Sequence, residues 1–124
     1  MSTEKINSQK YRVLLSGGFQ KLEEKCDQIN KLNVFPVPDG DTGDNMLMTL
    51  QSGLAETIAD GDMNLLCEAL SKGMLYGARG NSGVILSRFF YGMNGYFANY
   101  KDAISPNTFI AGLEHGVSDR KSVV

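Results

Sequence analysis

The sequence has no concentrated basic segment, no long apolar run, two cysteines and a single histidine. Its net charge is −2 and its lysines and arginines are scattered, which argues against nucleic-acid or anionic-membrane partners, since both need a concentrated basic surface. No run approaches the roughly 18 apolar residues of a membrane span. The polar first ten residues lack the apolar core of a secretory signal. We therefore expect a cytoplasmic protein.

The two cysteines, Cys26 and Cys67, lie far apart and lack the spacing of a metal site. In the cytoplasm they would be reduced, and both are expected to be small core residues. Apolar residues make up 42% of the chain and charged residues 21%, so a buried core is expected and gross disorder is not. A length of 124 residues suits one small domain, residues 1–124.

Apolar residues recur at spacings of three and four along most of the chain, which predicts helices. Three stripes cover Ser8–Asn30, Met46–Ile58 and Leu65–Met74. A fourth helix, Val84–Phe97, is apolar over much of its circumference and is expected to be central to the core. Ser105-Pro106 fits an N-cap followed by a first-turn proline, and a fifth helix follows. No alternating strand pattern is present, so we predict an all-α fold.

The segment Asn33–Gly43 contains two of the three prolines and cannot be a regular helix. Asp39 and Asp41 flank Gly40, so their carboxylates can turn toward one hard divalent cation. Magnesium commonly takes one or two carboxylates and completes its shell with water and phosphate oxygens. The arrangement is therefore compatible with a magnesium site.

The next residues lead into the second predicted helix, whose N-terminus offers unpaired N–H groups and the positive end of the helix dipole to a phosphate. These residues are Thr42, Gly43, Asp44 and Asn45. Thr42 can cap the helix, and Gly43 can let the backbone approach a ligand closely. Together the two features predict a magnesium–nucleotide site. An Asx-rich turn before a capped helix remains an alternative, whereas the EF-hand pattern fails after its first two ligands.

A second loop, Gly77–Gly83, has three glycines in seven residues and opens the fourth helix. The backbone N–H groups of Asn81, Ser82 and Gly83 could surround a second phosphate. The loop is neither a Walker A motif nor a G-x-G-x-x-G loop, and a glycine-rich turn between helices is the alternative. Arg79 could pair with phosphate oxygens, or it could form a salt bridge or face solvent.

The only histidine, His115, could act as an acid or base, although a lone histidine is more often a surface or packing residue. Its place near the end of the fifth predicted helix gives no further support for catalysis.

Two segments resemble the signature motifs of the dihydroxyacetone kinase nucleotide-binding (L-type) domain. They are Asn33–Met46 (NVFPVPDGDTGDNM) and Gly77–Ser87 (GARGNSGVILS). The most similar branch is the fatty-acid kinase A-subunit type. The resemblance implies an up-and-down antiparallel helical barrel of about eight helices, of which about five are present here. The domain is therefore expected to be incomplete at the C-terminus.

The resemblance also implies functional residues. Asp39 and Asp41 would bind Mg²⁺, and Asn33 falls near the position of a further ligand. The phosphates of ATP or ADP would be cradled by Thr42, Gly43, Asp44, Asn45, Ser82 and Gly83. Asp44 departs from the pattern, because the similar branch usually has threonine there. A carboxylate beside phosphates repels them unless a metal or a lysine compensates, and it could also add a metal ligand.

In the family that the chain resembles, the nucleotide donates its γ-phosphoryl group to an acceptor carried by a separate subunit. The acceptor is dihydroxyacetone in one branch and a fatty acid on a lipid-binding partner in the other. Three functions are therefore compatible with the sequence: the ATP-binding part of a kinase, a nucleotide- or metal-binding module without independent catalysis, and a structural helical domain. The open apolar edge of a partial barrel would favour association, for example as a homodimer.

Overall fold

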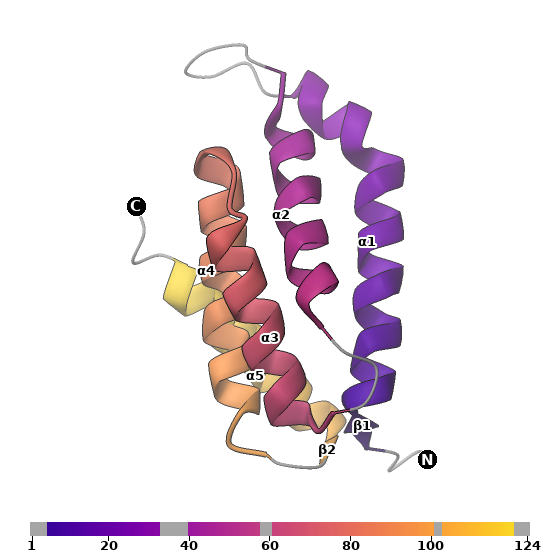
Figure 1. Ribbon diagram of the computed structural model, residues 1–124, viewed down its shortest axis with the longest axis vertical. Coiled ribbons are helices and arrows are strands. Elements are labelled where there is room, and N and C mark those ends of the chain that lie inside the picture. Colours follow the sequence, from indigo (N-terminus) through magenta and orange to yellow (C-terminus); the bar gives the residue numbers. More distant parts are fainter. Residues whose placement is uncertain (1–4, 33–39, 58–60, 101–102, 121–124) are drawn as a thin grey trace.

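The computed structural model describes residues 5–32, 40–57, 61–100 and 103–120 (Figure 1). Its elements are β1 (Ile6–Asn7), α1 (Ser8–Lys31), α2 (Thr42–Glu56), α3 (Met63–Tyr76), α4 (Gly80–Phe97), β2 (Ala103–Ile104) and α5 (Pro106–Arg120). Successive helices alternate in direction, as Figure 1 shows. The predicted all-α class is confirmed. Among the helices that the structure describes, none combines the length and apolar content that a bilayer crossing requires.

Two short strands were not predicted from the sequence. β1 and β2 form a short antiparallel ladder in which Ile6 lies opposite Ile104 and Asn7 opposite Ala103. Strands of two residues are too short to give an alternating pattern, so sequence periodicity could not detect them. The ladder joins the start of α1 to the start of α5, and Ile104 is almost completely buried there.

Local capping explains where three of the helices begin. The side chain of Asn7 accepts a hydrogen bond from the N–H of Lys10 at 2.8 Å, before α1. Asp62 Oδ1 accepts from the N–H of Leu65 at 2.8 Å, before α3. Ser105 Oγ accepts from the N–H of Thr108 at 3.1 Å, which confirms the predicted cap of α5.

α2 and α4 begin earlier than their apolar stripes predict. Their first turns, at Thr42 and Gly80, contain polar residues and glycines instead of the large apolar residues that mark a buried face. Much of the second glycine-rich loop is therefore the first turn of α4. α4 packs against α2, α3 and α5, which confirms its predicted central position.

A polar network crosses the apolar core. The core residues are Tyr11, Leu15, Leu50, Met63, Leu66, Cys67, Leu70, Met74, Met93, Phe97 and Ile104. Among them, Tyr11 donates its hydroxyl hydrogen to Asn94 Oδ1 at 2.6 Å. Asn94 Nδ2 in turn donates to Ser71 Oγ at 2.8 Å. These two bonds link α1, α4 and α3 through side chains alone.

Both cysteines are free and buried, as predicted. Cys67 lies within the core at 1% exposure, and burial raises the pKa of its thiol to about 12. Cys26 lies on α1 outside this core cluster, next to the start of α2, where its thiol donates to Asp44.

We expect alkaline solution to destabilise the chain, in part through Cys67. The folded pKa of about 12 exceeds the ordinary value of 9.0, so between these values the unfolded chain releases a proton that the folded chain retains. The contribution of the Cys67 thiol to the free energy of unfolding is complete below the unfolded pKa of 9.0. It falls by about 1.4 kcal/mol by about pH 10. Urea unfolding at about pH 8 and about pH 10 measures this loss. Cys67→Ala should lose less free energy over that interval; an equal loss in both proteins would contradict the assignment.

Candidate functional site

The described parts of the two predicted loops lie at the same end of the helices, where α1 and α3 end and α2 and α4 begin (Figure 1). Ser82 Oγ, in the first turn of α4, donates to the carbonyl oxygen of Thr42, the first residue of α2, at 3.3 Å. These residues are 40 positions apart in the sequence. The structure therefore brings the described parts of the two motifs together.

Close packing between α2 and α4 depends on two glycines of the second loop. A Cβ atom on Gly83 would lie 2.4 Å from Thr49 Oγ1, and one on Gly80 would lie 2.5 Å from Asn45 Nδ2. Gly80 also has a φ of 65°, in the left-handed region that favours glycine. The buried hydroxyl of Thr49 donates to the carbonyl oxygen of Asn45 at 2.7 Å and accepts from the N–H of Arg79 at 3.1 Å. The two helix starts are thus fixed relative to each other.

The predicted capping role of Thr42 was wrong. The N-cap residue of α2 is Asp41, and its side chain makes no capping hydrogen bond. The cap comes instead from α1, where Asn30 Oδ1 accepts from the N–H groups of Gly43 at 2.8 Å and Asp44 at 3.2 Å. Sequence analysis missed Asn30 because capping patterns are sought next to a helix start, and this residue lies 13 positions before Gly43.

Asp44 is also held from α1. Its Oδ1 accepts hydrogen bonds from the thiol of Cys26 at 3.1 Å and from Asn30 Nδ2 at 3.1 Å. These two bonds, that of Cys26 first, lower the pKa of the Asp44 carboxyl. The same bond to Asp44 is the main reason that the pKa of the Cys26 thiol is raised. Asp44 is therefore a carboxylate at neutral pH, at a helix end whose dipole favours negative charge.

Amide donors at the start of α2 are largely taken. The N–H groups of Gly43 and Asp44 donate to Asn30, and that of Asn45 donates to the carbonyl oxygen of Asp41 at 2.9 Å. Gly43 has a packing role as well, because a Cβ there would lie 2.6 Å from the carbonyl oxygen of Cys26.

The start of α4 offers more free amides. The N–H of Gly83 donates to the carbonyl oxygen of Arg79 at 3.1 Å. Within the described part of the chain, the N–H groups of Gly80, Asn81 and Ser82 have no hydrogen-bond acceptor. A helix start with free amides is a favourable place for an anion, in particular a phosphate.

Of the residues predicted to bind magnesium, only Asp41 lies in the described part of the chain; Asn33 and Asp39 lie outside it. Asp41 is exposed at the N-cap of α2 and follows Gly40, whose φ of 67° turns the backbone. No group of three or more His, Cys, Asp or Glu among the described residues is arranged to hold a metal ion. Asp41 and Asp44, at the start of α2, carry the hard carboxylate oxygens that magnesium prefers as ligands.

An apolar pocket of about 380 Å³ adjoins the two helix starts. It is lined by Met46, Ser82, Ile85, Leu86 and Phe89. Ser82 is shared between this pocket and the amides at the start of α4. The site therefore places apolar surface next to donors for an anion, as recognition of a nucleotide requires.

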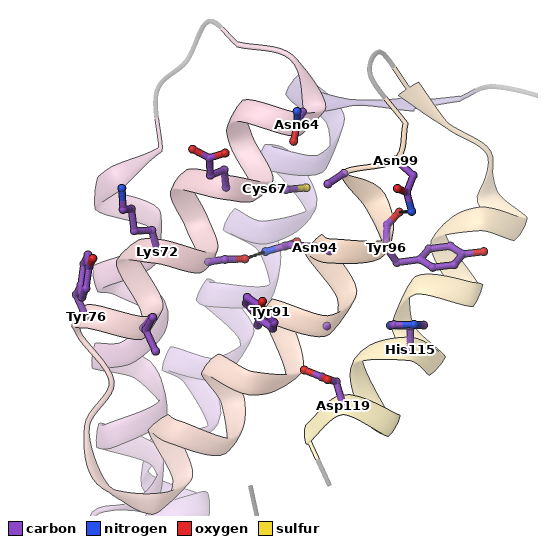
Figure 2. Close-up of a pocket in the computed structure, with 16 residues that line it drawn as sticks. Asn64, Cys67, Lys72, Tyr76, Tyr91, Asn94, Tyr96, Asn99, His115 and Asp119 are labelled. Carbon is purple, nitrogen blue, oxygen red and sulfur yellow. Dashed lines mark hydrogen bonds between the residues drawn. The ribbon is translucent and has the colours of Figure 1, made fainter. Parts of the chain in front are cut away.

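A larger groove of about 610 Å³ lies between α3, α4 and α5 (Figure 2). His115 lines it and packs against Tyr96, with the ring centroids 5.4 Å apart. No described residue of either predicted loop lines this groove, so the structure does not bring His115 to the described part of the candidate site. Leu75 and Tyr76, at its margin, are 64% and 79% exposed.

Comparison with known proteins places these motifs in a family. The model of the DAK2 domain family matches residues 36–124. Protein YloV of Bacillus subtilis (strain 168) is 41% identical over 119 residues, covering 94% of this chain and 21% of that protein. An uncharacterized protein of Staphylococcus epidermidis is 43% identical over 115 residues, covering 91% of this chain and 21% of that protein. An uncharacterized protein of Staphylococcus aureus (strain USA300) is 48% identical over 90 residues, covering 71% of this chain and 16% of that protein. The chain spans about a fifth of the length of these curated relatives.

Proposed function

This chain belongs to the DAK2 domain family, and we propose that it binds a magnesium complex of ATP or ADP as the nucleotide-binding part of a kinase. DAK2 domains belong to the dihydroxyacetone kinase family and bind nucleotide. The main support for the proposal is the hydrogen bond from Ser82 to Thr42, which joins the start of α4 to the start of α2. That bond places the free amides of α4 beside the carboxylates at the start of α2.

The described residues contribute to nucleotide binding in different ways. Gly80, Asn81 and Ser82 donate backbone N–H groups to phosphate oxygens, with the positive end of the α4 dipole behind them. Gly83 contributes by allowing the close approach of α2 and not as a donor. The apolar pocket lined by Met46 and Phe89 receives the base.

On the side of α2, the backbone of Thr42, Gly43, Asp44 and Asn45 forms the second wall of the phosphate site. Asp41 would hold magnesium together with Asp39, and Asn33 is proposed as a further ligand. The bound ion would supply positive charge that offsets repulsion between the phosphates and Asp44.

In the complete enzyme, the γ-phosphoryl group of ATP would pass to a fatty acid or a dihydroxyacetone-like acceptor carried by a partner protein. The residues of this chain would contribute mainly by positioning the nucleotide and neutralising its charge. A nucleotide-binding role without independent catalysis is the second candidate, since the chain spans 21% of its relative YloV. ATP turnover with and without an acyl-carrying partner distinguishes the two. Formation of a homodimer stays a prediction.

Isothermal titration with MgADP tests the proposal. We expect the unchanged chain to bind and the double variant Asp39→Ala/Asp41→Ala to bind at least about tenfold more weakly, which corresponds to about 1.4 kcal/mol of lost interaction. Asp62→Asn is the control, because it removes a carboxylate at the opposite end of the helices and leaves a residue that can still cap α3. Absence of heat from the unchanged chain, or equal affinity in the double variant, would refute the proposed site.

A further inference from the structure

Asn30, in the last turn of α1, makes three hydrogen bonds to the start of α2. Its Oδ1 accepts from the N–H groups of Gly43 and Asp44, at 2.8 Å and 3.2 Å. Its Nδ2 donates to Asp44 Oδ1 at 3.1 Å. One planar amide therefore satisfies two helix amides and also contacts the carboxylate that follows them.

Close packing of α1 and α2 makes these bonds possible. A Cβ on Gly43 would lie 2.6 Å from the carbonyl oxygen of Cys26 and 3.0 Å from Asn30 Oδ1. Only a residue without a side chain permits this approach. The thiol of Cys26, one helical turn before Asn30, donates the second hydrogen bond to Asp44 Oδ1 at 3.1 Å. Both donors to this carboxylate oxygen thus come from one face of α1.

We infer that Asn30 is a positioning residue of the nucleotide site: it fixes the start of α2 and the orientation of Asp44. This inference rests on the proposed function. Two amides at the start of α2, those of Gly43 and Asp44, are committed to Asn30, whereas those of Gly80, Asn81 and Ser82 on α4 have no acceptor within the described residues. The nucleotide therefore takes its amide donors mainly from α4, and Asn30 holds the carboxylate of Asp44 at a fixed place beside them.

The side chain of Asn30 combines an acceptor and a donor, which two variants can separate. Leucine has a similar size and supplies neither group. Aspartate keeps an acceptor for the two amides, at a helix end that favours negative charge, but it cannot donate to Asp44. Ser105→Ala is a matched control, because it removes the cap of α5 at the opposite end of the helices without changing charge.

Thermal unfolding, MgADP titration and amide hydrogen exchange are compared for the unchanged chain, Asn30→Leu and Ser105→Ala. Both variants should lower Tm by about 4–8 °C, the shift expected for one lost cap in a small domain. Only Asn30→Leu should weaken MgADP binding, by about tenfold, and only this variant should accelerate exchange at Gly43 and Asp44. A purely structural role would lower Tm alone, as Ser105→Ala does.

Equal MgADP affinity in Asn30→Leu and the unchanged chain would overturn the inference and leave the proposed function standing. Failure of the unchanged chain to bind MgADP would overturn both. If Asn30→Leu does not fold, Asn30→Asp replaces it. Weaker MgADP binding with slow exchange retained at Gly43 and Asp44 supports the inference, and unchanged binding overturns it.

Discussion

Replacing Asn94 by leucine is expected to destabilise the chain by about 3 kcal/mol, because it removes the centre of a buried hydrogen-bond network. Tyr11 is 1% exposed and Asn94 is 2% exposed, so water does not readily replace the acceptor that the Tyr11 hydroxyl loses. Tyr11 loses the acceptor of its 2.6 Å bond, and Ser71 loses the donor of its 2.8 Å bond. Figure 2 shows Asn94 on α4 at the back of the groove, with the bond toward α3 as a dashed line. Leucine is similar in size to asparagine, so the loss reflects unsatisfied polar groups and not a cavity.

A double-mutant cycle with Tyr11→Phe tests whether the network causes this loss. Tyr11→Phe leaves Asn94 Oδ1 without its donor, whereas the double variant Tyr11→Phe/Asn94→Leu leaves neither partner of that bond unsatisfied. The double variant should therefore lose less free energy of unfolding than the sum of the single variants, by about 1–2 kcal/mol. Urea unfolding of the four proteins gives the value. Strictly additive losses would show that the two side chains stabilise the core independently.

The helices were predictable because each buries one face. The stripe from Tyr11 to Ile29 and the cap at Ser105 depend on residues close in sequence, and the structure confirms both elements. The two-residue ladder between Ile6 and Ile104 was not predictable, since nothing in so short a strand differs from a loop.

The site was only partly predictable for a related reason. The motifs containing Thr42 and Ser82 stand out locally through their glycines and polar residues, but periodicity does not say that they meet. Asn30 lies at the end of a predicted helix, and the sequence does not distinguish it from other polar residues at helix ends. Its role arises because the end of α1 packs against the start of α2, which is a tertiary contact. The network of Tyr11, Asn94 and Ser71 has the same origin, because each partner lies on a different helix.

Substitution of Gly83 is the second change expected to lower stability strongly, because this glycine determines how closely α4 approaches α2. Gly83→Ala should destabilise the chain by about 2 kcal/mol, the balance of a clash costing about 3 kcal/mol and a gain of about 1 kcal/mol from the higher helix propensity of alanine. The new Cβ would lie 2.4 Å from Thr49 Oγ1, closer than real Cβ contacts allow. Thr49 cannot turn away without losing its bonds to Asn45 and Arg79, so the helices must separate.

Separation of α2 and α4 would also move the hydrogen bond between Ser82 and Thr42 that joins the two halves of the site. MgADP affinity in Gly83→Ala should therefore fall by about tenfold or more, measured by titration below the Tm of the variant. Gly95→Ala is the matched control on the same helix, because a Cβ there meets nothing within 4 Å. That control should be neutral or stabilising by up to about 1 kcal/mol. If Gly83→Ala gained stability as Gly95→Ala does and bound MgADP normally, the tight contact between α2 and α4 would not be what assembles the site.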